Sequence, residues 1–144
     1  MNGDTILSIT LIGAFLVLSA FFSSSEAAFL SLQRTRLSHL VNTNVPGARR
    51  VADMVSNIER LLSTILLGNN LVNVAFTAII TALSVRLIED SPLAILVATI
   101  SGTVVLLIFG EIIPKSIAVR KAERMSFLYA RPLKALELCM FPAI

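Results

Sequence analysis

Cysteine and histidine occur only once each in the sequence, as Cys139 and His39. A single cysteine excludes an internal disulfide, and without a neighbouring cysteine it forms no metal motif. His39 lies among residues expected at a membrane interface with no second ligand near it, so we assign it no metal role. Any metal site in this chain is therefore expected to use oxygen ligands rather than thiolate or imidazole.

Charge is also scarce. Charged residues make up 15% of the 144 residues and hydrophobic residues 56%, and the mean hydropathy is +0.85. A small soluble domain could not hide so much apolar surface in its core. The net charge of +3 would suit nucleic acid, but the basic residues flank apolar segments instead of gathering beside aromatic residues on one face. The composition therefore predicts an integral membrane domain without a nucleic-acid partner.

Three long runs contain no charged residue at all. The first, residues 5–25, reaches about 30 Å as a helix, which is enough to cross the hydrocarbon core of a bilayer. It is not expected to be a cleaved signal peptide, because residues 1–4 contain no Lys or Arg and end in an acid, the reverse of a basic leader. We predict an all-α membrane protein with three spans. Their approximate bounds are residues 5–33, 61–86 and 91–114.

Further helices are predicted at the membrane interface, in two regions. The approximate bounds of these regions are residues 46–60 and 116–138. In the first, Val51, Met54 and Val55 keep the i, i+3, i+4 spacing of an apolar helix face, which is expected to lie on the membrane surface. The second has too short an apolar stretch for an ordinary span, and we expect Pro132 and Pro142 to break this region.

The basic residues predict the orientation. Of the 12 Lys and Arg residues, only Arg86 falls in the loop between the second and third spans, and the others fall on the opposite side. The positive-inside bias places the N-terminus outside and the C-terminus in the cytoplasm. The expected location is the plasma or inner membrane, which the chain crosses several times.

A glycine, a carboxylate and a proline stand close together where the third run ends, in Phe109–Lys115. Pro114 has no N–H, so in a helix the carbonyl of Gly110 loses its donor and needs another partner inside the bilayer. A bare Glu111 carboxylate at that depth would cost about 2.5 kcal/mol or more, so a cation or a proton is expected beside it. The alternative is an ion pair with Lys115, four residues further along the same helix.

Other polar residues recur at a similar depth. Ser19 and Ser23 share one face of the first helix, with Glu26 about one turn nearer the cytoplasm, and Asn69 and Asn73 share one face of the second helix. We estimate depth by counting residues from the nearest basic residue on the cytoplasmic side. By this count Ser23, the two asparagines and Glu111 all lie roughly 14–20 Å inward. Hydroxyl, amide, carbonyl and carboxylate oxygens favour Mg²⁺, Ca²⁺, Mn²⁺ or Na⁺. The predicted metal site comprises Ser19, Ser23, Asn69, Asn73, Gly110 and Glu111, supported by Pro114 and Glu26.

Helix packing is the alternative for the neutral members of this set, because serine and asparagine also join helices in membranes. For Ser24, Ser25 and Ser31 we favour that interpretation, or a hydrogen bond back to the backbone of their own helix. Two asparagines on one face beside a glycine favour a functional role for that pair.

Three strings in the sequence, residues 18–29, 67–73 and 109–115, together resemble the transmembrane domain of the CorC/CNNM (cyclin M) magnesium transporters. The likeness covers nearly the whole chain, and three separated motifs in the right order make it specific. It implies a homodimer in the lipid bilayer, with three spans per protomer, a juxtamembrane helical belt and a Mg²⁺ site that opens inward. It also implies a cytosolic CBS-pair module, which would bind ATP in a longer chain and is not contained in these 144 residues.

Position by position, the resemblance carries over the family's paired serines, its two asparagines and its Gly-Glu-x-x-Pro turn. These fall on Ser19 and Ser23, Asn69 and Asn73, and Gly110, Glu111 and Pro114. Glu26 departs from the pattern, because the animal members carry asparagine there.

The expected function is therefore export of Mg²⁺ by alternating access around the oxygen cluster, and the resemblance implies that inward movement of Na⁺ is coupled to it. The alternative is a magnesium sensor or a membrane scaffold that transports nothing and whose cation is structural. An enzyme is not expected, because the sequence contains no nucleophile–base pair and no nucleotide motif.

Overall fold

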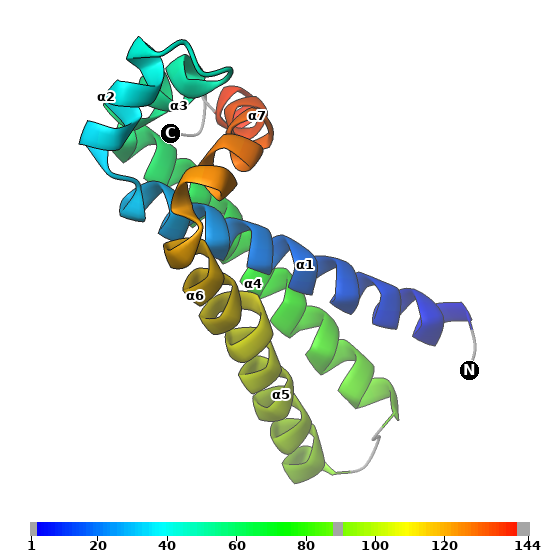
Figure 1. Ribbon diagram of the computed structural model, residues 1–144. Coiled ribbons are helices and arrows are strands. Elements are labelled where there is room, and N and C mark those ends of the chain that lie inside the picture. Colours follow the sequence, from blue (N-terminus) through cyan, green and yellow to red (C-terminus); the bar gives the residue numbers. More distant parts are fainter. Residues whose placement is uncertain (1–2, 88–90, 141–144) are drawn as a thin grey trace.

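The computed structural model describes residues 3–87 and 91–140, and every element within those ranges is helical. Three of the helical stretches are long and apolar enough to cross a membrane (Figure 1). The predicted all-α class and the three long apolar helices are therefore confirmed.

The first two long helices are α1 (Gly3–Ser31) and α4 (Ile58–Leu87). The third is a continuous stretch of three elements. These are α5 (Pro92–Leu107), the π-helical turn η1 (Ile108–Ile112) and α6 (Ile113–Arg120). The second helix begins before the predicted residue 61, and the third extends past the predicted residue 114. The start of the second helix and the end of the third therefore both contain charged residues. The backbone hydrogen bonds of each helix continue past its apolar run into the membrane interface.

The long helices pack around α1, which contacts α4, η1 and α6. In Figure 1, α1 and α4 run in opposite directions and α5 returns beside α4. Helices that run in opposite directions bring residues late in one helix beside residues early in the other. This arrangement allows the polar residues of the three stretches to meet.

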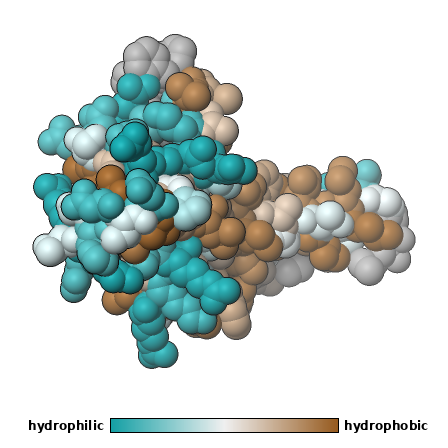
Figure 2. All heavy atoms as spheres, turned by 45° about the horizontal axis from the view of Figure 1, so that its top comes forward, coloured by the Kyte–Doolittle hydropathy of each residue, from teal (hydrophilic) through white to brown (hydrophobic). Residues whose placement is uncertain are grey.

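The remaining helices are α2 (Arg34–Asn42), α3 (Ala48–Ser56) and α7 (Ala122–Met140). They gather at one end of the long helices, and we call these three helices the belt (Figure 1). Figure 2 shows hydrophilic side chains gathered over the belt and hydrophobic ones along the helices that extend from it. This distribution matches a polar cap on an apolar, membrane-spanning bundle.

The predicted helix over residues 46–60 is wrong in its bounds. The helix begins only at Ala48, because Gly47 has a φ of +85°, a left-handed conformation that glycine adopts without strain. It ends at Ser56, and residues 58–60 belong to α4. Pro46 therefore precedes the helix instead of starting it.

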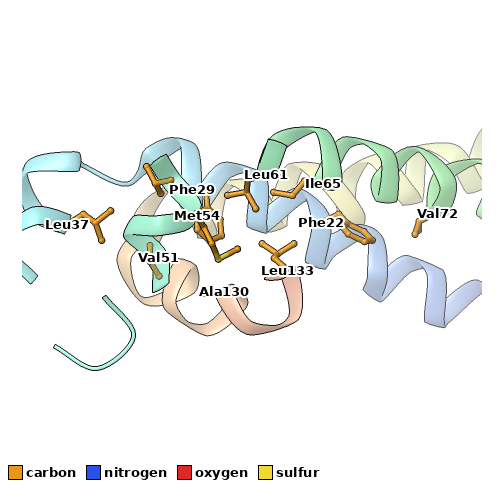
Figure 3. Close-up of a cluster of buried hydrophobic side chains, with 11 residues drawn as sticks. Phe22, Phe29, Leu37, Val51, Met54, Leu61, Ile65, Val72, Ala130 and Leu133 are labelled. Carbon is orange, nitrogen blue, oxygen red and sulfur yellow. The ribbon is translucent and has the colours of Figure 1, made fainter. Parts of the chain in front are cut away.

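The apolar face of α3 does not lie on the membrane surface, which corrects a second expectation. Val51 and Met54 are buried in a cluster with Phe29, Leu61 and Leu133 (Figure 3). These partners come from α1, α4 and α7. Other helices of the same protein therefore cover the apolar face of α3. The belt thus has a packed core of its own, continuous with the long helices.

The predicted break at Pro132 is also wrong, because α7 continues through this residue. The proline removes the donor that the Leu128 carbonyl would have used. The helix is held on both sides of it, since Ala130 and Leu133 are buried in the same core. The expectation for Pro142 lies outside the described residues.

Candidate cation site

Ser19 lies at the point where the three long helical stretches meet. Its side chain is fully buried, and its Oγ lies 3.2 Å from Asn73 Oδ1 and 3.5 Å from the carbonyl oxygen of Gly110. The hydroxyl has a single proton to donate, so it can satisfy only one of these two oxygens at a time. The crossing point therefore contains more acceptors than donors.

Asn73 extends this contact to the third helical stretch. Its Nδ2 donates a hydrogen bond of 3.1 Å to Oε1 of Glu111. Ser19, Asn73 and Glu111 thus form one polar chain from α1 through α4 to η1. With the carbonyl of Gly110, which lies 3.5 Å from Ser19 Oγ, these contacts bring together four of the predicted site residues.

The π-helical turn explains how Gly110 and Glu111 reach this position. The N–H of Ile113 bonds to the carbonyl of Ile108, five residues back. Pro114 follows directly and cannot donate to the carbonyl of Gly110, so the wider π turn accommodates the missing bond. The sequence predicted the displaced carbonyl but not the π turn.

Glycine at position 110 is required by the close approach of α1. A Cβ atom there would lie 2.9 Å from Ser19 Oγ and 3.2 Å from Ser19 Cβ. Any side chain would therefore push the serine away from the carbonyl. The absence of a side chain is what lets a backbone oxygen face the hydroxyl.

Ser23 and Asn69 lie about one turn from the Ser19–Asn73 contact. Because α1 and α4 run in opposite directions, the step from Ser19 to Ser23 and the step from Asn73 to Asn69 both lead toward the belt. Ser23 Oγ and Asn69 Oδ1 are buried and have no hydrogen-bond partner within the described part of the chain. Buried polar atoms normally have one, and each exception needs a reason, such as a bound ion.

The packing of Phe22 against Gly68 fixes this level of the interface, and sequence reasoning missed it. A Cβ atom on Gly68 would lie 2.5 Å from the Phe22 ring, so only glycine lets the ring sit against α4. The signal available was a glycine directly before Asn69 in an otherwise apolar run.

Glu26 is not part of the polar chain. Its Oε2 lies 3.7 Å from Nζ of Lys115, which joins α1 to α6 on the belt side of the cluster, and both side chains are partly exposed. The alternative pairing of Lys115 with Glu111 is not formed. The i, i+4 rule assumes 3.6 residues per turn, and the π turn that includes Glu111 changes the angle between the two side chains.

The serines assigned to backbone bonding behave as predicted where the structure gives their contacts. Ser24 Oγ donates to the carbonyl of Ala20 at 2.7 Å, and Ser25 Oγ donates to that of Phe21 at 2.6 Å. Both hydroxyls are therefore satisfied within α1. Ser23 directly precedes these two serines in sequence, and its hydroxyl oxygen has no hydrogen-bond partner among the described residues.

The candidate site depends on neutral oxygens around a single acid. Within the residues that the structure describes, no group of three or more His, Cys, Asp or Glu side chains could hold a metal. A thiolate or imidazole centre of the kind that zinc prefers is thus not found in this part of the chain. The donor set is instead hydroxyl, amide, carbonyl and carboxylate oxygen, which fits hard cations.

Comparison with known proteins extends the argument beyond this chain. The family described as "Cyclin M transmembrane N-terminal domain" matches residues 10–144. A UPF0053 protein of Haemophilus influenzae is 41% identical over 129 residues, which cover 90% of this chain and 30% of that protein. The UPF0053 inner membrane protein YfjD of Escherichia coli is 37% identical over 127 residues, which cover 88% of this chain and 29% of YfjD.

A plant protein shows a similar match. A putative DUF21 domain-containing chloroplastic protein of Arabidopsis thaliana is 33% identical over 133 residues, which cover 92% of this chain and 20% of that protein. The chain therefore spans less than a third of the length of these curated relatives.

Proposed function

The chain belongs to the cyclin M transmembrane-domain family, and from this premise we propose that it forms the membrane domain of a Mg²⁺ exporter. The family predicted from the three motifs is confirmed. The family and the three apolar helices support a transporter-type membrane domain, and one relative carries the name of an inner membrane protein. The ion, its direction and the coupling are our proposal.

The observation that carries the proposal is the cluster of oxygens at the crossing of α1, α4 and η1. It contains one carboxylate, Glu111, and that carboxylate has no ion pair among the residues that the structure describes. Two further oxygens, on Ser23 and Asn69, are buried and have no hydrogen-bond partner in the same described part of the chain. Mg²⁺ takes about six oxygen ligands at roughly 2.0–2.1 Å and usually keeps several waters. A small set of protein oxygens with a single acid supports such a substrate.

The residues of the cluster have distinct parts in the proposed transport. Asn73 holds the Glu111 carboxylate in place through its Nδ2 and leaves the second carboxylate oxygen open to a cation. Ser23 and Asn69 lie on the belt side and meet an ion that arrives from the cytoplasm first. Lys115, whose Nζ lies 3.7 Å from Glu26 Oε2, is on the same belt side of the cluster. Its positive charge competes with the arriving cation for the nearby carboxylates. Alternating access then exposes the same oxygens to the outside.

Sodium is the proposed coupling ion. Na⁺ is also a hard cation that oxygen ligands suit, so one oxygen cluster can serve Mg²⁺ on the way out and Na⁺ on the way in. We further propose that the chain works as a homodimer, with its N-terminus outside and its C-terminus in the cytoplasm. A cytosolic CBS-pair module and its ATP are proposed only for a longer protein, since the chain spans less than a third of its relatives.

The test is Mg²⁺ release from vesicles that contain the purified chain. Vesicles are loaded with Mg²⁺, a Mg²⁺-sensitive dye is placed outside, and Na⁺ is supplied outside in one arm and omitted in the other. The wild-type chain should release Mg²⁺, faster with the Na⁺ gradient. Glu111→Gln should reduce release to that of empty vesicles, because it removes the only carboxylate of the cluster.

Glu59→Gln is the matched control, because Glu59 is an exposed acid at the start of α4. It should release Mg²⁺ as the wild type does. Undiminished release by Glu111→Gln would refute the role of this residue. A wild-type chain that binds Mg²⁺ but releases none would instead favour the sensor or scaffold.

A further inference from the structure

A basic groove lies between α3 and α7 on the belt, away from the oxygen cluster. Its volume is about 690 Å³. One wall comes from the first turn of α3 and the other from the middle of α7. Its lining includes Arg49, Arg50, Asp53, Phe127, Arg131 and Lys134. The nine lining residues comprise four cations and one acid.

The four cations have no ion-pair partner among the residues that the structure describes. The ion pairs found there belong to other basic residues, namely Arg36, Arg60 and Lys115, each of which lies within 4 Å of a carboxylate oxygen. The lining of the groove thus contains four cations against a single acid, Asp53. This excess of positive charge favours an anion from outside the chain.

The position of Arg49 and Arg50 has no explanation in the stability of α3. The N-terminal turn of a helix favours acidic side chains, because the amide dipoles are positive there. The first turn of α3 contains no acid, and its N-cap Gly47 offers no side-chain cap. Two arginines at this end oppose the helix dipole, and an anion bound between them would remove that conflict.

The groove also has apolar surface of the kind that a lipid needs. Phe127 lines it and is shared with a neighbouring groove that contains Arg120, Lys121 and Arg124. Leu128 and Leu138, on the same helix, are exposed at 68% and 62%. A helix that presents basic and apolar residues together is typical of a membrane surface.

We propose that this groove binds the phosphate of an anionic phospholipid headgroup in the leaflet on the belt side of the membrane. The arginines of α3 and the basic residues of α7 hold the phosphate from two sides, because guanidinium groups bond phosphate oxygens in pairs. The neighbouring apolar side chains contact the upper part of the acyl chains. The lipid thereby joins α3 to α7. This site does not depend on the proposed transport of Mg²⁺.

The experiment measures lipid binding to the purified chain in detergent by native mass spectrometry. Phosphatidylglycerol is titrated against phosphatidylcholine, and inorganic phosphate and glycerol phosphate are added as soluble competitors. The wild type should bind phosphatidylglycerol saturably and in preference to phosphatidylcholine. Arg131→Gln/Lys134→Gln should bind it about 25-fold more weakly, because each cation near an anionic lipid headgroup contributes about a fivefold increase in affinity.

Two further variants make the result specific. Arg49→Gln/Arg50→Gln removes the opposite wall and should show a similar loss, which keeps the test informative if changes in α7 disturb folding. Arg34→Gln/Arg86→Gln removes the same charge outside the groove and should bind as the wild type does. Full binding by both groove variants would overturn the proposal, and so would an equal loss in the control. Displacement of the lipid by millimolar inorganic phosphate would also overturn it, in favour of a site for free phosphate.

Discussion

Two acids in different parts of the molecule have opposite surroundings. Glu137 of α7 is 4% exposed, and its Oε1 lies 3.0 Å from Nε of Arg60 at the start of α4. Glu111 of the π turn is partly buried among apolar helices and accepts a hydrogen bond from the amide of Asn73. Among the described residues, the belt acid therefore has a cation as its partner, whereas the acid of the long helices has a neutral amide.

The difference bears on the proposed roles of the two acids, a structural one for Glu137 and a functional one for Glu111. In a buried ion pair the two charges neutralise each other. If one partner is removed, the other stays buried as an uncompensated charge, which destabilises the fold. An acid held only by an amide keeps its charge available, which is expensive within a bilayer unless a cation joins it. This contrast can be tested by substituting residues of the belt pair and residues of the oxygen cluster separately.

The largest effect on stability is expected in the belt. Glu137→Gln should destabilise the protein by about 3 kcal/mol, at the lower end of the range for broken buried pairs because Arg60 is partly exposed. Thermal unfolding in detergent measures this change. The double variant Arg60→Met/Glu137→Leu should regain most of the loss, since apolar residues of similar size often replace a buried pair. A Glu137→Gln variant as stable as the wild type would show that the pair is not structural.

A smaller effect is expected where α1 approaches the π turn. Gly110→Ala should cost about 1–3 kcal/mol, because the added Cβ would lie 2.9 Å from Ser19 Oγ and overpack the crossing. It should also weaken Mg²⁺ binding in calorimetry by displacing the hydroxyl. Gly13→Ala is the control, because nothing lies within 4 Å of its added Cβ. Equal Mg²⁺ affinity in both variants would remove the Ser19–Gly110 approach from the site.

The smallest effect is expected at the oxygens without partners. Ser23→Ala should weaken Mg²⁺ binding about 3- to 10-fold, the size of one ordinary polar contact. Ser25→Ala should not weaken it, because the hydroxyl of Ser25 already bonds to the carbonyl of Phe21 at 2.6 Å. Calorimetry measures the Mg²⁺ affinity of both variants, which differ only in which buried serine of α1 is replaced. Indistinguishable affinities would assign Ser23 to packing.

The sequence predicted the features that depend on local composition. The three runs without charge gave the long helices, and Pro114 with Gly110 indicated a displaced carbonyl where η1 now lies. Ser19, Asn73 and Glu111 were chosen by depth and face, and they are joined by hydrogen bonds. Whether they bind a cation stays a prediction.

The features that were missed depend on partners far away in the sequence. Periodicity identified the apolar face of α3 but could not reveal that Leu133 of α7 would cover it. The sequence could not reveal the ion pair of Arg60, because its partner Glu137 lies 77 positions later. The ion pair of Lys115 with Glu111, which the i, i+4 spacing offered as the alternative, is not formed, and Lys115 Nζ lies 3.7 Å from Glu26 Oε2 instead.

The most direct measurement is the Mg²⁺ dependence of unfolding for the wild type and for Glu111→Gln. A ligand that binds only the folded state raises the unfolding temperature as its concentration rises. The wild type should be stabilised by Mg²⁺, while Glu111→Gln should be at least as stable as the wild type without Mg²⁺ and gain nothing when it is added. A Glu111→Gln variant that Mg²⁺ stabilises as much as the wild type would contradict the account, and so would one that is destabilised like Glu137→Gln.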